Sequence, residues 1–116
     1  MEDIDIIYKN DLGIAFIWKR CVVDKHRKIN LVFNNVALHC TNDELNHFST
    51  LIEESFDRAS RCTKCQDIKT CKTILLETPV SQVSFTTNYN ELTAIKDLVS
   101  GTTFVMGLDT VLKKIL

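Results

Sequence analysis

The stretch TNDELNHFSTLIEESF, residues 41–56, decides the fold because it holds both the start signal and the buried face of a helix. Thr41 and Glu44 have capping-box spacing: the hydroxyl can accept a bond from the amide of Glu44, and the carboxylate can reach back to the amide of Thr41. Apolar residues then recur at helical intervals: Leu45, Phe48, Leu51, Ile52 and Phe56. We therefore expect an amphipathic helix just after Thr41.

The residues before this helix alternate as β-strands do. INLVF and VALHC flank Asn34 and Asn35, and asparagine tolerates the positive φ of a tight hairpin, although one long strand is the alternative. Further upstream, the segments 4–9 and 13–19 flank a turn at NDLG. Their alternation places three residues of each segment on one face: Ile4, Ile6 and Tyr8, and likewise Ile14, Phe16 and Trp18.

The strand–helix pattern recurs 47 positions later. Asn88 and Glu91 restore the capping box, and TILLET, Pro79 and VSFTT imitate the earlier hairpin. Gly101 stands where this second helix would end, and the residues from Leu108 to Leu116 predict a final short helix. We infer two strand–strand–helix units, which an internal repeat would explain.

These elements predict an α+β fold: a largely antiparallel sheet of about six strands with helices on one face, and two ββα-like repeats after an N-terminal hairpin. We expect a single domain over residues 1–116. Its parts are a hairpin and basic tip (1–28), a first ββα unit (29–57), a basic cysteine loop (58–72) and a second ββα unit with a terminal helix (73–116). The other sheet face would be exposed or used for self-association, with Trp18 as either an interface or a core residue.

The stretch INLVFNNVALHCTNDELNHF resembles small uncharacterised proteins of Bacteroidota. The resemblance rests on Phe33-Asn34-Asn35 and on the spacing from Thr41 to Phe48, and it extends over residues 29–99. It implies a cytosolic bacterial setting, and it carries no activity that could be transferred.

Composition also favours a cytoplasmic globular protein. The 116 residues are 45% hydrophobic and 25% charged, which is ordinary for this class. No apolar run approaches the ~20 residues of a membrane span, so we expect no membrane partner. The acidic N-terminal sequence has no signal-peptide core. Five cysteines are an odd number, which argues against a secreted disulfide framework.

Positive charge is concentrated in two windows, residues 19–28 and 58–72. They hold ten of the fourteen basic residues and two of the fifteen acidic ones, so they carry +8 and the remainder −9. The candidate basic surface consists of Lys19, Arg20, Lys25, Arg27, Lys28, Arg61, Lys64, Lys69 and Lys72. Phosphate binding needs such residues on one face, but neither window holds an aromatic residue for base stacking. Nucleic acid is therefore a weaker partner hypothesis than a protein.

The sequence RCTKCQDIKTC places Cys62, Cys65 and Cys71 within ten positions. The Cys-x-x-Cys spacing lets two thiolates meet one tetrahedral zinc ion, and Cys71 would add a third. Cys21 is a candidate fourth ligand, and His26, His39 and Cys40 are further candidates for that position. A disulfide or redox sensor is a second interpretation, because neighbouring lysines and arginines favour thiolates. Three free thiols in a basic loop is the third.

No constellation of acid, base and nucleophile can be assembled from residue spacing, so we expect a protein that is not an enzyme. The favoured function is a small interaction or assembly module, which forms a homodimer or binds a protein partner and has a zinc-stabilised cysteine loop as one option. The alternatives are a redox-responsive regulator using Cys62, Cys65 and Cys71, and a nucleic-acid-associated factor using the basic windows.

Overall fold

The computed structural model describes residues 4–18, 28–61 and 73–115, with side chains of the last segment described as far as residue 108. Its elements are β1 (Ile4–Lys9), β2 (Gly13–Trp18), β3 (Ile29–Phe33), β4 (Val36–Cys40), α1 (Asn42–Ser60), β5 (Ile74–Glu77), β6 (Ser84–Thr87) and α2 (Tyr89–Ile115). Strands β1 to β4 form one sheet in chain order, and β5 pairs with β6 in a second sheet. All these pairings are antiparallel.

The segment that begins with β3 forms as the sequence predicts. Asn34 and Asn35 have φ angles of 52° and 64°, so a two-residue hairpin joins β3 to β4. Thr41 caps α1: its hydroxyl accepts from the Glu44 amide at 3.1 Å, and its amide donates to the Glu44 carboxylate at 3.0 Å. The helix then continues to Ser60, beyond the predicted apolar stripe.

The second strand–strand–helix segment has the predicted elements but not the predicted sheet. Asn88 and Glu91 form a capping box at the start of α2, with bonds of 2.8 and 3.1 Å. The expectation of one six-stranded sheet is wrong, because β5 rests on α1 instead of joining β4. There the Ser55 hydroxyl donates to the carbonyl of Leu75 at 3.0 Å. The internal repeat itself stays a hypothesis.

The predicted helix end at Gly101 is also wrong, since α2 runs through it to Ile115 and absorbs the predicted terminal helix. A Cβ at Gly101 would lie 2.5 Å from the ring of Tyr8, so this glycine allows β1 to approach the helix closely. The Tyr8 hydroxyl donates to Asp97 at 3.0 Å, and the Asn10 amide donates to the Ala94 carbonyl at 2.9 Å. Gly101 therefore marks the point where α2 contacts Tyr8 of β1, and not the end of the helix.

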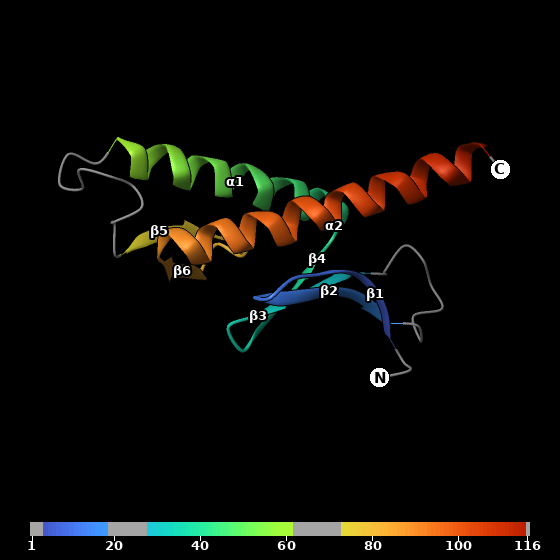
Figure 1. Ribbon diagram of the computed structural model, residues 1–116, viewed down its shortest axis with the longest axis horizontal. Helices are drawn as coiled ribbons and strands as arrows, with labels where there is room; N and C mark the ends of the chain where they lie inside the picture. Colours follow the sequence, from blue (N-terminus) through green and yellow to red (C-terminus); the bar gives the residue numbers. More distant parts are fainter. Residues whose placement is uncertain (1–3, 19–27, 62–72, 116) are drawn as a thin grey trace.

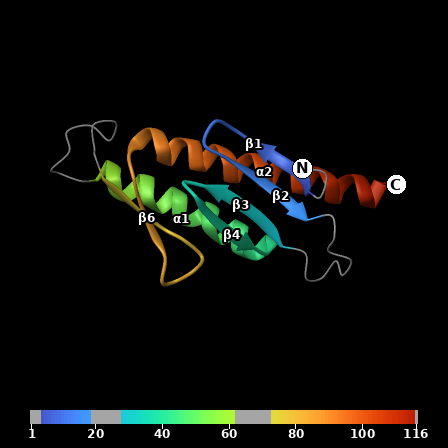
Figure 2. The same ribbon diagram turned by 90° about the horizontal axis from the view of Figure 1, so that it is seen from below.

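Both helices cover the same face of the four-stranded sheet (Figure 1). They lie side by side in opposite directions, and Lys96 of α2 forms an ion pair with Glu53 of α1 at 3.1 Å. The core lies between helices and sheet, where Leu31, Phe48 and Leu98 are fully buried. Figure 2 looks onto the other face of the sheet, with the strands in front of both helices. Within the described residues, no helix is long and apolar enough to cross a membrane.

Candidate functional site

The strongest candidate site is the face of the four-stranded sheet that points away from the helices. We call it the outer face. The strand pairing places the following side chains on it: Ile4, Ile6, Lys9, Ile14, Phe16, Trp18, Asn30, Val32, Ala37 and His39. Most of these side chains are apolar, and none of the described elements packs over them. A sheet normally buries its apolar face against another layer, so an apolar outer face is a candidate docking surface.

A β-bulge decides which residues of β1 reach this face. The register shifts between Ile6, which pairs with Phe16, and Tyr8, which pairs with Ala15. Ala15 is fully buried on the helix side, so Tyr8 turns towards α2. The predicted shared face for Ile4, Ile6 and Tyr8 is therefore wrong for Tyr8, because the extra residue reverses the alternation. Trp18 belongs to the outer face, so its core alternative is excluded.

An aromatic pair on β2 extends from the middle of the outer face to its end. Phe16 and Trp18 make an edge-to-face contact with ring centroids 5.3 Å apart. Trp18 remains 45% exposed, and Ile6 on the neighbouring strand is 54% exposed. Aromatic side chains that keep this much exposed surface can supply the anchors of a protein interface.

The β3–β4 side of the outer face carries a polar pair. The Asn30 side chain is buried, and its amide donates to the carbonyls of Phe16 and Lys28 at 3.4 and 3.3 Å. Its oxygen can only accept, so Nδ1 of the exposed His39 donates to it. His39, a candidate zinc ligand in the sequence, is thus exposed and hydrogen-bonded to Asn30.

The predicted metal or redox site lies outside the described residues, since it consists of Cys21, Cys62, Cys65 and Cys71. Its geometry therefore stays a prediction. Cys40, a further candidate ligand, lies in the core, where burial raises the pKa of its thiol to about 11. A buried, protonated thiol is a poor zinc ligand. Over residues 4–18, 28–61 and 73–115, no three His, Cys, Asp or Glu residues come close enough to hold a metal ion.

The predicted basic surface is described only at Lys28 and Arg61, both of which are exposed. Arg61 follows the C-terminal end of α1 and forms an ion pair with Asp57 at 3.0 Å. Lys28 precedes β3, whose start pairs with Cys40 just before α1 begins. The 19 residues of α1 therefore separate these two points by about 28 Å. Seven predicted residues lie outside the described segments: Lys19, Arg20, Lys25, Arg27, Lys64, Lys69 and Lys72.

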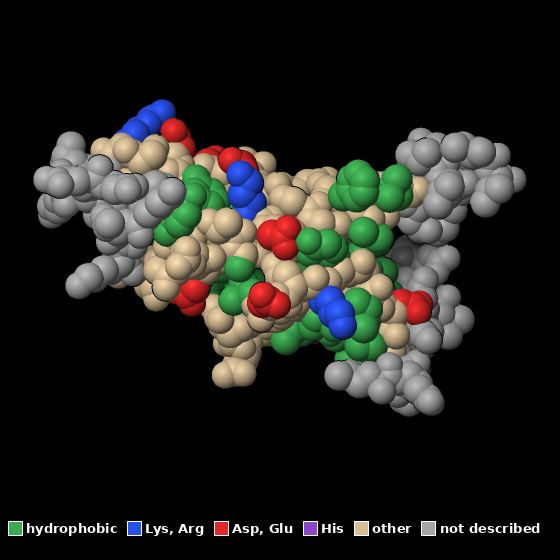
Figure 3. Space-filling view, viewed as in Figure 1, with side chains coloured by type: hydrophobic (Ala, Val, Ile, Leu, Met, Phe, Trp, Pro, Cys, Tyr) green, Lys and Arg blue, Asp and Glu red, His purple; other side chains and the backbone are tan. Residues whose placement is uncertain are grey.

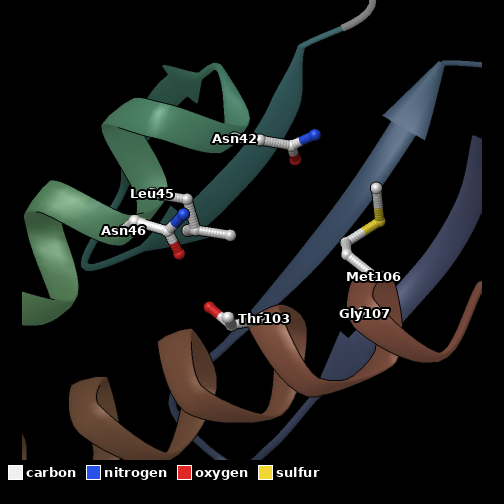
Figure 4. Close-up of a pocket in the computed structure, with 6 residues that line it drawn as sticks. All are labelled: Asn42, Leu45, Asn46, Thr103, Met106 and Gly107. Atoms are coloured by element: carbon white, nitrogen blue, oxygen red, sulfur yellow. The ribbon is translucent and has the colours of Figure 1, made fainter. Parts of the chain in front are cut away.

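Two hollows and a second apolar patch are weaker candidates. A cleft of about 180 Å³ separates the start of α1 from α2; Asn42, Leu45, Asn46, Thr103, Met106 and Gly107 line it (Figure 4). Another, of about 280 Å³, lies between α1 and the β5–β6 turn. Both fall below the roughly 300–1,000 Å³ of small-molecule sites.

The second apolar patch lies on the C-terminal half of α2, where hydrophobic side chains gather above those of β1 (Figure 3). Phe104 is 66% exposed there, and Leu108, one turn later, is 46% exposed. Sequence reasoning missed Phe104 because it ended this helix at Gly101. The spacing of Phe104 and Leu108 could have revealed the patch in an uninterrupted helix.

A comparison with protein-family models matches residues 1–113 to a family of unknown function, DUF6686. The chain belongs to this family. The match agrees with the expectation of an uncharacterised family and assigns no activity, whereas the resemblance to Bacteroidota proteins over residues 29–99 stays a prediction. No curated protein and no solved structure matches the chain.

Proposed function

We propose that this protein is a non-enzymatic interaction module that docks a protein surface on the outer face of its four-stranded sheet. One observation carries the proposal: an apolar sheet face, with Ile6 and Trp18 about half exposed, lies opposite the face that both helices bury. Aromatic residues are enriched in the cores of protein interfaces, and charged residues are depleted there. Phe16, Trp18 and the uncharged side chains between β1 and β4 fit that composition.

A site-specific cross-link in living cells tests this proposal. A photoreactive phenylalanine analogue replaces Trp18 in one variant and Leu75 in the control. Leu75 is 49% exposed, close to the 45% of Trp18, but it belongs to the separate β5–β6 sheet. We expect a discrete cross-linked protein from position 18 and none from position 75.

The mass of the adduct distinguishes the kinds of partner. An adduct of two chains would identify self-association, and any other discrete mass would identify a different protein. Absence of an adduct from position 18, or the same adducts from both positions, would contradict the proposal.

A further inference from the structure

We infer that the occupant of the outer face is a second copy of this chain, packed sheet against sheet around a two-fold axis. This inference rests on the proposed function, because it names the partner of the same surface. Face-to-face packing of two sheets is a common solution, with the sheets about 10 Å apart and their strands roughly 30° from parallel.

The distribution of charge on the outer face fits self-association. A two-fold interface brings each patch against its own copy, so a patch with a charged centre would repel itself. Here the centre is uncharged: Phe16 and Val32 lie on its two middle strands, between Ile6 and Ala37 on its edges. Two lysines lie at its borders, with Lys9 at the last position of β1 and Lys28 just before β3. Two copies can therefore meet without opposing like charges at the centre.

The apolar character of the face also favours a second copy over a different protein. Homodimer interfaces are on average more apolar than protein interfaces taken as a whole. The outer face carries one charged side chain, Lys9, among the positions that the strand pairing assigns to it. Among the described residues of the face, no arrangement of charges would select a particular foreign partner.

The outer face is small for a dimer interface. The face consists of four strands of five or six residues each, so we expect the pair to bury an area near the lower limit of specific interfaces, about 1,000 Å² in total. We therefore expect a reversible dimer with a dissociation constant of about 1 μM or weaker. Such a dimer dissociates upon dilution, which makes it measurable.

The experiment measures the mass of the purified full chain by sedimentation across a range of concentrations that brackets this dissociation constant. A reductant is present throughout, so that intermolecular disulfides cannot contribute. We expect the mass to rise from 13.3 kDa towards twice that value. Trp18 is the one tryptophan of the chain. Its emission should shift to shorter wavelength over the same concentration range, because dimerisation would remove its ring from water.

Matched variants assign the dimer to a surface. Ile6→Lys introduces a charge on the edge strand β1, directly beside Phe16 of the outer face, and should weaken association by at least about 10-fold. Leu75→Lys and Phe104→Lys place the same charge on other exposed apolar sites and should leave the dissociation constant unchanged. Trp18→Ala, read by mass alone, provides a second disruption that adds no charge. Circular dichroism verifies that each variant folds.

Two results would overturn the inference. One is a mass of a single chain at every concentration. The other is a dimer that Phe104→Lys or Leu75→Lys weakens while Ile6→Lys and Trp18→Ala do not. If the chain is a monomer but position 18 gives an adduct with a different protein in cells, the homodimer is wrong and the proposed interaction module is supported. Absence of both dimer and adduct would sink both proposals.

Discussion

The two faces of the four-stranded sheet are built from the same strands but have opposite surroundings. On the inner face, Ala15 and Leu31 are fully buried beneath the helices. Each has a neighbour in the chain, Phe16 and Val32, that points to the outer face and remains partly exposed. Apolar residues occupy both faces, so hydrophobicity alone does not tell which face is the core.

The helices that come after the strands in the chain make the two faces different. β4 leads directly into α1, whose apolar stripe packs against the inner face. α2 is held to the same side by Tyr8 and Asn10, which bond to it from β1 and the adjoining turn. The inner face thus contributes to the buried core, whereas apolar residues of the outer face such as Ile6 and Trp18 stay about half exposed.

The largest expected effect comes from truncating the inner face. Leu31→Ala removes a fully buried side chain and should lower the free energy of unfolding by about 2–5 kcal/mol. Val32→Ala, one position later on the outer face, should cost about 1 kcal/mol or less, since that side chain keeps contact with water. Denaturant unfolding at concentrations where the chain is monomeric measures both.

Equal losses for Leu31→Ala and Val32→Ala would mean that something covers the outer face of the monomer. That result would remove the basis of the proposed docking surface. If the loss of unfolding free energy in Val32→Ala instead grows with protein concentration, folding is coupled to association of the chain through the outer face.

A chemical difference between adjacent residues sharpens the comparison. Cys40 points inwards, and burial raises the pKa of its thiol from an ordinary value of 9.0 to about 11, which leaves about 100-fold fewer thiolates at neutral pH. His39 points outwards and is exposed. We expect alkylation of Cys40 to require unfolding, whereas acylation of His39 proceeds in the native protein; peptide mass spectrometry measures both. Rapid native alkylation of Cys40 would contradict the inward assignment.

The third prediction concerns how closely α2 approaches the edge of the sheet. Gly101→Ala places a methyl group 2.5 Å from the ring of Tyr8, whereas at Gly107 nothing lies within 4 Å of an added Cβ. Alanine favours a helix over glycine by about 1 kcal/mol at either site, but overpacking should cost about 1–3 kcal/mol at Gly101 alone. The unfolding free energies of the two variants should therefore differ by about 1–3 kcal/mol.

The titration of Tyr8 provides an independent readout of the same contact. Its hydrogen bond to Asp97 raises the pKa of its hydroxyl group. If Gly101→Ala displaces the ring, this pKa should fall towards its ordinary value, and Gly107→Ala should leave it unchanged. An equal gain in stability for both variants, with no change in the titration, would show that the ring adjusts without loss.

Short sequence motifs correctly predicted the secondary-structure elements in which they occur. The Thr41 and Asn88 capping boxes located two helix starts, and Asn34-Asn35 located a hairpin, because each signal depends on atoms a few positions apart. The errors came from contacts across the fold. Glycine is typical of a helix end, which is why the sequence predicted one at Gly101. The glycine is instead explained by the ring of Tyr8, 93 positions away in the chain.

The candidate site was predictable only in part. Alternation showed that β2 places Phe16 and Trp18 on one face, but it could not say which face the helices would cover. The bulge in β1 gave no sequence signal, so the reversal of Tyr8 was missed. The split into two sheets accompanies contacts of β5 with α1, such as the Ser55–Leu75 bond, which joins residues 20 positions apart. The cysteine loop and most of the basic surface stay predictions.

The smallest expected effect concerns the junction that directs α1 over the inner face. Thr41→Ala removes the capping hydroxyl and should lower the free energy of unfolding by about 1 kcal/mol. Thr50→Ala is the control, because the Thr50 hydroxyl bonds only to the Asn46 carbonyl within the same helix, and alanine there should be neutral or slightly stabilising. Equal effects at both positions would mean that tertiary packing alone fixes the start of α1.

Glu44 gives the same junction a pH dependence of known sign. The bond from the Thr41 amide, together with the Thr41 hydroxyl, lowers the pKa of the Glu44 carboxyl group in the folded protein. Its contribution to stability is therefore fully present above the unfolded pKa of about 4.3 and is lost as the pH falls through the folded pKa. Glu44→Gln should be less stable than the native chain at pH 7, and this difference should vanish in acid. A difference that persists below both pKa values would show that the carboxylate charge does not stabilise the cap.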